Sequence, residues 1–396
     1  MAELVALTME GGPAFVDAVR RVWDDGDAFT PVDPRLPEAE RTAVLAAVGP
    51  TAVIGEDGER RRLDPAGYGS TTPSDPLEPG DAVVVATSGT SGHPKAVIHT
   101  HDGVTASARA VHRALGVDPA TDRWLACLPL AHIGGLAVVM RSLVTGTAVE
   151  VHPRFEAGAT LDAARRGATL VSLVTRALTR IPAGAFRTIV IGGAAPPPDR
   201  PANVVATYGS TETGSGVVYD RHPLDGVDLD VTPEGEIRVR GPMLFRAYRH
   251  DPDPFDPDGW VRTGDMGRWG DDGLIEVDGR AGDVIVTGGE KVWPARIETL
   301  LAERADVEAA VLIGRPDPEW GHRVVAVVVP TDPAAPPVLD DLREAVADRF
   351  GRWAAPKELE IRSALPRSAL GKVQRHRLVR ADGDVGPDRP QRSARA

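Results

Sequence analysis

The sequence predicts a large N-terminal α/β domain of layered sheets with a small β-rich subdomain, followed by a smaller α+β C-terminal domain. Three changes of pattern along the chain predict this fold class. Residues 82–208 alternate short apolar runs with helical periodicity, which is typical of α/β domains. Residues 226–240 alternate apolar and polar positions, as short half-buried strands do. From residue 279 onward, strands and helices form one further unit of ordinary domain size.

The elements of the first domain are expected to follow one another in regular order. Val104, Ala108, Val111 and Leu115 recur at helical spacing and predict a helix over 102–115. Apolar, β-rich runs predict strands at 82–86, 124–128, 148–151, 170–174, 188–191 and 204–208, and two more helices are expected at 136–144 and 161–166.

The remaining elements belong to the subdomain and the second domain. Residues 236–240 are the clearest strand of the subdomain, and further strands are expected at 285–286, 307–313 and 324–329, with helices at 294–303 and 339–349. We therefore expect a first domain over 1–278, a hinge at 279–283 and a second domain over 284–380. The tail, 381–396, has almost no apolar residue and is expected to be disordered.

Composition indicates a soluble enzyme rather than a nucleic-acid-binding or membrane protein. The 396 residues are 42% hydrophobic and 26% charged, with a net charge of −12. This charge argues against nucleic acid or an anionic membrane as the main partner, so small-molecule substrates are expected. Cys127 is the one cysteine and lies in an apolar run, which suggests an inert core thiol and a reducing, cytoplasmic setting. The sequence leaves a homodimer open.

The most informative segment begins in the strand expected at 82–86. It continues as Thr87-Ser88-Gly89-Thr90-Ser91-Gly92-His93-Pro94-Lys95. Small residues let a backbone approach an anion closely, and hydroxyl and amide groups donate to phosphate oxygens. Gly92 and Lys95 are not adjacent, so this is not a Walker A loop. The alternative is a flexible polar loop after a strand.

This loop resembles the phosphate loop of the adenylate-forming superfamily, which includes the acyl-CoA synthetases. Five further segments match that superfamily in the right order: 128–136 around His132, 207–213 around Tyr208, 260–265 ending at Asp265, 278–292 around Gly288 and Gly289, and 366–375 around Lys372. Each has a plainer interpretation by itself, such as a turn for 207–213, a helix-start histidine for His132 or a solvated lysine for Lys372.

The resemblance implies which residues bind ATP. Tyr208 stacks on adenine, Asp265 accepts hydrogen bonds from the ribose, and the loop with Lys95 holds phosphates. The implied ATP- and AMP-binding residues are Thr87, Ser88, Gly89, Thr90, Ser91, Gly92, Lys95, Gly192, Gly193, Tyr208, Gly209, Thr211, Asp265 and Arg280.

It also implies two half-reactions, in which a carboxylate forms an acyl-adenylate with ATP and a thiol of coenzyme A then displaces AMP. Lys372 and Glu212 are the implied catalytic groups of the first step, with Glu212 as the ligand of Mg²⁺, which prefers few protein oxygens plus phosphate and water. Gly288 and Gly289 face CoA in the second step, so the C-terminal domain must turn. The usual hinge residue is Asp or Lys, whereas this chain has Gly282.

The acyl substrate is predicted from charge. From Trp124 to Arg141 there is no carboxylate to hold an amine, and the segment offers His132 and Arg141 instead. The resemblance implies that His132 is a third catalytic residue and that it contacts the substrate at the mouth of the acyl pocket. The runs at 128–143, at 208–226 and at 33–37 resemble those of actinobacterial o-succinylbenzoate–CoA ligases of menaquinone biosynthesis. Arg141 would then hold the second carboxylate of the substrate, unless it is a structural arginine paired with a nearby acid. Another small aryl- or acyl-CoA ligase and a catalytically degenerate homologue stay open.

Overall fold

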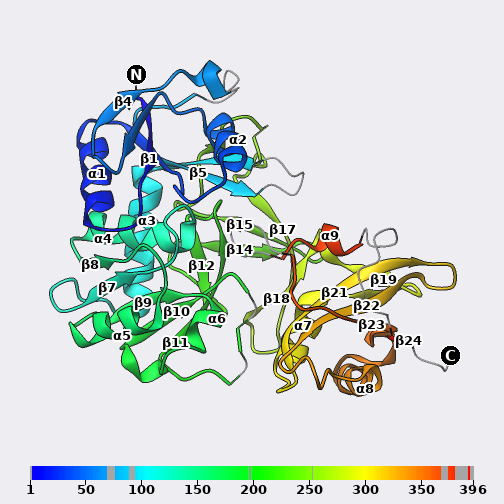
Figure 1. The fold of residues 1–396 in the computed structure, drawn as a ribbon. Helices are drawn as coiled ribbons and strands as arrows, with labels where there is room; N and C mark the ends of the chain where they lie inside the picture. Colours follow the sequence, from blue (N-terminus) through cyan, green and yellow to red (C-terminus); the bar gives the residue numbers. More distant parts are fainter. Residues whose placement is uncertain are drawn as a thin grey trace. The chain divides into compact units, whose positions relative to one another are not determined.

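The structure is a computed structural model that describes residues 2–68, 76–88, 94–194, 196–197, 199–251, 253–366, 373–379 and 391–392. The chain forms two compact units (Figure 1). The first comprises Met1–Asp230 and Arg238–Arg262, and the second comprises Val231–Ile237 and Thr263–Ala396. The predicted fold class is confirmed. The expected domain limits at 278, 283 and 380 stay predictions.

The first unit is built on two seven-stranded sheets. The first sheet has the order β16-β6-β5-β2-β1-β3-β4 and the second has the order β13-β12-β11-β10-β9-β7-β8. The first sheet consists of β1 (Leu4–Thr8), β2 (Ala28–Pro31), β3 (Ala52–Gly55), β4 (Arg60–Arg62), β5 (Asp81–Ser88), β6 (Pro94–Thr100) and β16 (Ala247–Tyr248). The second consists of β7 (Arg123–Ala126), β8 (Ala148–Val151), β9 (Leu170–Leu173), β10 (Thr188–Ile191), β11 (Val204–Ser210), β12 (Ser215–Tyr219) and β13 (His222–Pro223).

Helices cover these sheets in layers. The helices are α1 (Pro13–Asp24), α2 (Glu38–Val48), α3 (His101–Leu115), α4 (Ile133–Thr145), α5 (Ala157–Arg165) and α6 (Thr175–Leu178). Figure 1 shows α3 and α4 between the two sheets, and α3 contacts β5 and β6 of the first sheet and β12 of the second. Because α3 is packed on both sides, its apolar stripe of Val104, Ala108, Val111 and Leu115 is buried as predicted.

The second unit carries its own sheet and core. One four-stranded sheet has the order β14-β15-β17-β18 and consists of β14 (Asp228–Val231), β15 (Glu236–Arg240), β17 (Val261–Trp269) and β18 (Ile275–Arg280). From Thr263 onward, β17 and β18 belong to the second unit. The larger sheet has the order β20-β19-β22-β23-β24, with β21 beside β22. Its strands are β19 (Ile285–Thr287), β20 (Glu290–Val292), β21 (Val307–Asp317), β22 (Gly321–Pro330), β23 (Glu358–Ile361) and β24 (Gln391–Arg392), and its helices are α7 (Pro294–Ala302), α8 (Leu339–Phe350) and α9 (Arg375–Val379).

Every strand and helix expected from residue 82 onward is present, although several bounds differ by a few residues. The two strands that flank the predicted phosphate loop pair with each other. Lys95 lies in β6, which pairs antiparallel with β5, and these two strands form a β-hairpin, called the phosphate hairpin below. Of the tail that was expected to be disordered, the structure describes Gln391 and Arg392, which pair with β23.

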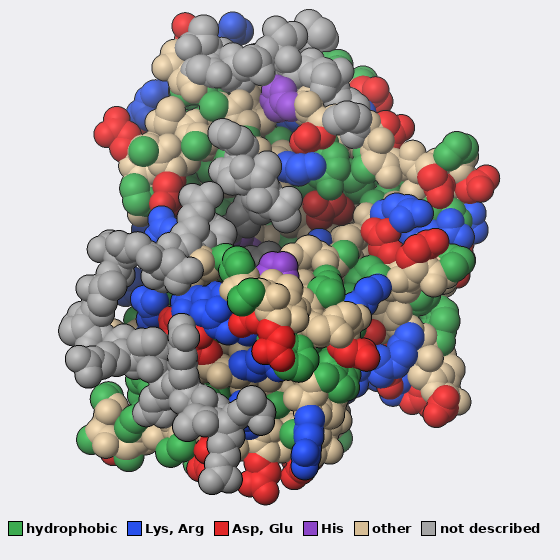
Figure 2. All heavy atoms as spheres, turned by 90° about the vertical axis from the view of Figure 1, so that its right-hand side faces the viewer, with side chains coloured by type: hydrophobic (Ala, Val, Ile, Leu, Met, Phe, Trp, Pro, Cys, Tyr) green, Lys and Arg blue, Asp and Glu red, His purple; other side chains and the backbone are tan. Residues whose placement is uncertain are grey.

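Charges of both signs are interspersed on the surface. On the face drawn in Figure 2, Lys and Arg side chains lie beside Asp and Glu side chains. Among the described residues, ion pairs such as Arg238–Asp230 and Arg240–Asp228 join charges of opposite sign. Within the described part of the chain, no helix is both long and apolar enough to cross a lipid bilayer.

Candidate active site

The structure distributes the predicted site residues over both units. Thr87, Lys95, His132, Arg141, Gly192, Gly193, Tyr208, Gly209, Thr211 and Glu212 belong to the first unit, and Asp265, Arg280, Gly288 and Gly289 belong to the second. Ser88 ends β5. Gly89, Thr90, Ser91, Gly92 and Lys372 lie outside the described residues, so their roles stay predictions.

Glu212 and Lys95 meet at a tyrosine that sequence reasoning missed. The phenol of Tyr248 donates a hydrogen bond to Oε1 of Glu212 at 3.0 Å, and Lys95 Nζ lies 4.6 Å from the centre of the Tyr248 ring. Lys95 also approaches Asp251, with 3.6 Å between Nζ and Oδ1. Tyr248 reaches this place because β16 pairs with β6, opposite Val97. One aromatic ring therefore joins the cation of the phosphate hairpin to the predicted metal ligand.

The predicted nucleotide motif lies at a tight turn between β11 and β12. The pairing register shifts between Tyr208 and Gly209, which marks a β-bulge. A Cβ atom on Gly209 would lie 2.1 Å from the carbonyl oxygen of Ser215, so no other residue fits there. Thr213 closes the turn, because its hydroxyl accepts from Ser210 N at 2.8 Å and donates to Ser215 O at 2.7 Å.

The buried side chain of His99 makes a hydrogen bond to the same turn. His99 Nε2 lies 2.7 Å from the carbonyl oxygen of Thr211, and His99 is 1% exposed. Burial lowers the pKa of His99 to about 4, although the Thr211 carbonyl and the charge of Glu212 act in the opposite direction. The imidazole is therefore neutral at physiological pH and donates from Nε2.

Gly192 and Gly193 follow β10, beside the same motif. A Cβ on Gly192 would lie 2.8 Å from Oγ1 of Thr207, which itself donates to Ile191 O at 3.0 Å. Gly193 has a φ of +83°, which favours glycine. The parallel pair β10–β11 thus brings both predicted nucleotide segments to the same carboxyl edge of the second sheet, where α/β sheets bind ligands.

Arg141 is buried in α4, and no carboxylate of the described residues pairs with it. It is 5% exposed, and its guanidinium lies 4.9 Å from the centre of the Trp124 ring. Burial lowers the pKa of Arg141, and the opposing contributions come from the Tyr219 phenol rather than from an acid. Its Nε has no hydrogen-bond partner within the part of the chain that the structure describes. A fully desolvated cation in this state lacks its counter-charge.

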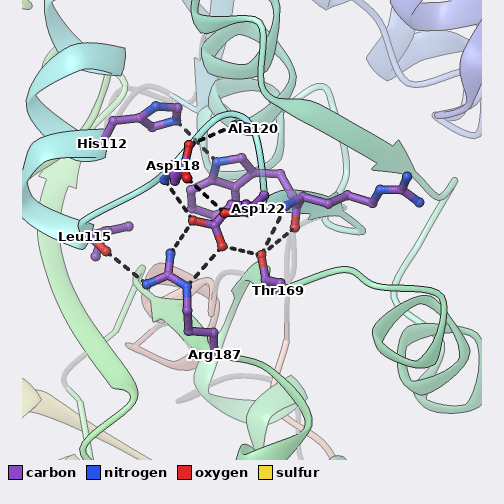
Figure 3. A network of polar contacts seen from close by, with 10 residues as sticks. His112, Leu115, Asp118, Ala120, Asp122, Thr169 and Arg187 are labelled. Carbon is purple, nitrogen blue, oxygen red and sulfur yellow. Dashed lines mark hydrogen bonds and ion pairs between the residues drawn. The ribbon is translucent and has the colours of Figure 1, made fainter.

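The nearby buried acid, Asp122, is saturated by other donors (Figure 3). Oδ1 of Asp122 accepts from Thr169 Oγ1 at 2.7 Å and from Arg187 Nε at 3.0 Å. Oδ2 accepts from Arg187 Nη2 at 2.8 Å and from Asp118 N at 2.9 Å. Burial by itself would raise the pKa of Asp122, but these hydrogen bonds lower it. The alternative that Arg141 is a structural arginine paired with a nearby acid therefore has no support in this network.

A cavity connects Arg141 with the nucleotide motif. It is small and lies between α3, α4 and the turn after Glu212. Its lining residues are His99, Gly103, Val104, Ser107, Ala108, Ala137, Met140, Arg141 and Gly214. The walls are mainly apolar, with one guanidinium and a few hydroxyl or imidazole groups, which is the usual composition of a small-molecule site.

His132 does not line this cavity. It immediately precedes α4, and nine residues of helix correspond to about 13 Å of rise between His132 and Arg141. Burial lowers the pKa of His132, while the charge of Asp33 acts to raise it. Asp33 and Arg35 line a second cavity together with Leu130 and Ala131, just before His132 in the chain.

In the second unit, Asp265 and Arg280 form a cross-strand pair. They lie opposite each other on β17 and β18, with 2.9 Å between Asp265 Oδ1 and Arg280 Nε. Arg280 also donates to Thr263 O at 2.9 Å, and Thr263 Oγ1 accepts from Asp265 N at 3.1 Å. The carboxylate that the resemblance assigns to the ribose is therefore held in place by the arginine that it assigns to the nucleotide.

Gly288 and Gly289 form the two-residue turn of the β19–β20 hairpin, whose strands pair Thr287 with Glu290. Their φ values are +58° and +87°, as a type I′ turn requires. A Cβ on Gly288 would lie 2.8 Å from the Trp320 ring. Turn geometry and close packing therefore explain both glycines without CoA, and their predicted contact with CoA stays a proposal.

The donor set fits Mg²⁺ held mainly by phosphate and water. In the described ranges, no group of three or more His, Cys, Asp or Glu side chains forms a metal cage. Glu212 offers a carboxylate whose Oε1 is oriented by Tyr248. Mg²⁺ commonly binds through one or two carboxylates plus substrate phosphates, so this arrangement suits it.

Comparison with known proteins confirms the resemblance. Residues 2–249 match the AMP-binding enzyme family, and residues 296–372 match the AMP-binding enzyme C-terminal domain. The chain belongs to the AMP-binding enzyme family. A relative in this family, named probable 2-succinylbenzoate–CoA ligase, from Mycobacterium tuberculosis, is 40% identical over 76% of this chain and 84% of its own length. The 2-succinylbenzoate–CoA ligase of Enterococcus faecalis is 27% identical over 95% of this chain and 88% of its own.

Solved structures of other proteins have the same fold. The o-succinylbenzoate CoA synthetase of Bacillus subtilis, in complex with its acyl-adenylate intermediate, matches with a TM-score of 0.83 and 25% identity. The match covers 98% of this chain and 89% of that one. ATP-bound MatB of Rhodopseudomonas palustris matches with a TM-score of 0.81 and 24% identity over 96% and 88% of the two chains, which supports the fold alone.

Sequence reasoning missed three residues that contact predicted site residues. Tyr248, His99 and Trp124 contact Glu212, Thr211 and Arg141, respectively. The residues around each of them show no sequence motif that would distinguish them from an ordinary buried strand. The signal that was available is the single polar residue, His99, in the apolar strand 96–99.

Proposed function

We propose that this chain is an o-succinylbenzoate–CoA ligase. In the first half-reaction, a carboxylate oxygen of o-succinylbenzoate attacks the α-phosphorus of ATP, and pyrophosphate leaves. In the second, the thiol of CoA attacks the acyl carbon, AMP leaves and the thiol proton is released. The AMP-binding family uses ATP and CoA in this way, whereas the acid is specific to this proposal.

The observation that carries the proposal is the buried guanidinium of Arg141, which lines the cavity beside the nucleotide motif and has no carboxylate partner among the described residues. o-Succinylbenzoate has two carboxylates, of which only one is activated. The other must enter the site as an anion, and an unpaired buried anion costs several kcal/mol. Arg141 has no such counter-charge among the residues that the structure describes, and its planar fork suits a carboxylate. A net charge of −12 makes a local cation necessary.

The proposed roles of the other predicted site residues follow from the motifs in which they lie. Tyr208, Gly209 and Thr211 bind the adenylate at the β11–β12 turn, with Gly192 and Gly193 beside them. Bound Mg²⁺ would neutralise phosphate charge next to Glu212. Lys372 is the proposed cation of the first half-reaction, Asp265 the ribose ligand and the Gly288–Gly289 turn the CoA-facing element. Cytoplasmic location stays part of the proposal and draws on the lone, buried cysteine.

The test is acid-dependent exchange of pyrophosphate into ATP, with o-succinylbenzoate compared with mono-acid analogues that lack the second carboxylate. Wild type should prefer the di-acid. Arg141→Leu should lose about 10²-fold in kcat/KM for the di-acid and little for the mono-acid, as expected for a lost charge-assisted hydrogen bond. Arg180→Leu is the matched control, because Arg180 also stacks on an aromatic ring, 5.2 Å from Phe155, but does not line the cavity.

A second candidate acid follows from the same guanidinium. Arg141 would also receive a sulfonate, and a sulfoacetate–CoA ligase of Cupriavidus necator is 33% identical over 90% of this chain. Sulfoacetate therefore belongs in the panel. If sulfoacetate supports exchange and o-succinylbenzoate does not, the substrate is overturned while the role of Arg141 stands. If no acid supports exchange, the chain is a degenerate homologue and the proposal fails.

Lys372→Ala separates the two half-reactions. It should abolish adenylate formation and leave thiolysis of supplied acyl-adenylate much less affected, because the ammonium neutralises charge that develops only when pyrophosphate leaves. Adenylate formation near the wild-type rate would remove Lys372 from this role.

A further inference from the structure

The guanidinium of Arg141 has no negative charge beside it in the described part of the chain. Arg141 is 5% exposed, and its Nε makes no hydrogen bond to any described residue. The nearby acid, Asp122, pairs with Arg187 instead (Figure 3). Removing an ion from water costs several kcal/mol unless an opposite charge or a set of hydrogen bonds replaces the water. The described residues therefore leave this buried cation without a compensating charge.

The side chains around Arg141 are neutral at physiological pH. The guanidinium lies over the Trp124 ring, 4.9 Å from its centre. The Tyr219 phenol shares a hydrogen bond with Arg141, and burial raises the pKa of that phenol, so it stays protonated. Burial and the charge of Arg141 lower the pKa of His112 to about 4, so its imidazole is uncharged. None of these three groups supplies a negative charge.

The cavity that Arg141 lines is small and mainly apolar. Among the described residues that line it, none is Asp or Glu. Ala108 and Ala137 contribute methyl groups to its walls, and Ala137 lies one helical turn before Arg141 on α4. An anion that enters such a space leaves most of its water behind, and the guanidinium is the charge that compensates for this loss.

A hydroxyl group gives the cavity a second donor. Ser107 is 6% exposed, and its Oγ lies 3.4 Å from Oγ of Ser215. Hydroxyl oxygens that share a good hydrogen bond are roughly 2.7–2.8 Å apart, so this contact is weak and leaves the Ser107 proton available to an anion. His99 also lines the cavity, but its Nε2 proton is used by the carbonyl oxygen of Thr211.

Two acids lie close in sequence to residues of the cavity, but neither lines it. Asp102 precedes Gly103 and is exposed, so water screens its charge. Glu212 lies two residues before Gly214, and its Oε1 accepts from the Tyr248 phenol. The donors in the cavity are thus one guanidinium and one hydroxyl, with no carboxylate beside them.

We propose that this cavity is a binding site for a small monovalent inorganic anion, chloride, held by Arg141 and Ser107 in the ligand-free protein. The anion supplies the counter-charge that the described residues lack. The carboxylate of an acid substrate carries the same charge and displaces it. This displacement rests on the proposed function, whereas the anion site itself does not.

The first test compares melting temperatures of the ligand-free protein in sodium chloride and in sodium gluconate. Equal ionic strength cancels screening, and gluconate is too large for the cavity. A ligand that binds only the folded state stabilises it, so chloride at about ten times its dissociation constant should raise the melting temperature by about 2–4 °C. Equal melting temperatures in the two salts at every concentration would overturn the proposal.

Three variants separate the site from general salt effects, because the two salts also differ in their effect on any protein. Arg141→Met should lose the chloride-specific shift, so its stability relative to wild type is greatest in gluconate. Ala137→Leu keeps the guanidinium but fills the cavity, and should lose the shift as well. Arg180→Met is the matched control and should keep it, because Arg180 stacks on Phe155 and does not line the cavity.

The shift is a difference between two salts within one protein, so a variant of lower overall stability still gives an answer. A full shift in Arg141→Met would place the anion elsewhere and contradict the proposal. Bromide locates the anion directly. Crystals soaked in sodium bromide should show an anomalous scattering peak beside the Arg141 guanidinium, and peaks found only at other places would overturn the site.

Kinetics separate this inference from the proposed function. Chloride should compete with the di-acid. At about ten times its dissociation constant it should raise the KM of the di-acid about tenfold, with kcat and the KM of a mono-acid unchanged. If chloride stabilises the protein but competes with no acid, the anion site stands and the proposed contact between Arg141 and the second carboxylate fails. If chloride has no effect on stability while Arg141→Leu selectively loses the di-acid, the anion site fails and the proposed function stands.

Discussion

The phenol of Tyr248, in the first sheet, donates a 3.0 Å hydrogen bond to Oε1 of Glu212, which lies in the turn between β11 and β12 of the second sheet. The same ring lies beneath the ammonium of Lys95, at 4.6 Å. Tyr248 therefore orients the carboxylate proposed to hold Mg²⁺ and at the same time contacts the cation of the phosphate hairpin. Two groups that sequence motifs identify separately are joined by a residue that belongs to neither motif.

Tyr248→Phe should raise the Mg²⁺ concentration needed for half-maximal exchange and lower turnover about 10-fold, because a hydrogen bond to a charged group is lost while the ring remains. Glu212→Gln, which removes the charge, should cost about 10²-fold. A magnesium titration of both variants beside wild type measures this. Identical titrations would exclude Glu212 from the metal site and Tyr248 from orienting it.

Arg141→Met should stabilise the ligand-free protein while it destroys preference for a di-acid. The guanidinium is 5% exposed and has no acid partner among the described residues, and replacing buried charge with an apolar chain of similar volume is often neutral or stabilising by about 1–4 kcal/mol. Urea unfolding without substrate checks the sign. Arg187→Met is the contrasting variant. It removes the guanidinium that pairs with the buried Asp122 carboxylate, so it should lower the free energy of unfolding. A large loss of stability in Arg141→Met would show that the residue serves the fold.

Gly282→Asp should fold as well as wild type. A Cβ at Gly282 meets nothing within 4 Å, and its φ is outside the left-handed region. Gly289→Asp is a matched control in equally open space, but its φ of +87° should cost about 1 kcal/mol. Melting temperatures test the contrast. The same Gly282→Asp protein, assayed for both half-reactions, shows whether a hinge side chain alters the thioester step.

Because the pKa of His99 is lowered in the folded protein, we expect the free energy of unfolding to decrease at acidic pH. Burial lowers its pKa from 6.5 to about 4. The unfolded chain therefore binds a proton between these values while the folded protein does not, so folding free energy is lost as the pH falls from 6.5 to 4. A shift of this size corresponds to about 3 kcal/mol.

The measurement is urea unfolding of wild type and His99→Gln across that pH range. The variant has no titrating group at this site, so wild type should lose about 3 kcal/mol more than the variant between pH 6.5 and 4. Groups common to both proteins cancel in the difference. Parallel stability curves would show that His99 takes up its proton without penalty in the folded protein.

Cys127 should be unreactive in the native protein. It is fully buried, and burial raises the pKa of its thiol to about 12, so the nucleophilic thiolate is absent at neutral pH. A colorimetric disulfide reagent should detect no thiol in the folded protein and one after unfolding, because the chain has one cysteine. Rapid native labelling would contradict the buried position of β7 and the residue that follows it.

The sequence by itself determined the order of the segments, the fold class and the positions where only glycine fits. Gly209, Gly288 and Gly289 are set by local geometry, as a bulge and a two-residue turn require. The helix 102–115 was predictable because its apolar residues recur at helical spacing and so indicate which face is buried. These features depend on backbone preference and periodicity, which act over a few residues.

Only the tertiary structure decided which charged and polar groups meet. Thr211 is held by His99, 112 residues away, and Glu212 by Tyr248, 36 residues away. Arg187 rather than Arg141 binds Asp122, and Glu298 takes Arg375 across 77 residues. An arginine in the sequence shows a cation but not its partner, because the partner depends on how strands pair and helices pack. Arg141 became informative only when the nearby acid Asp122 was seen to be bound elsewhere.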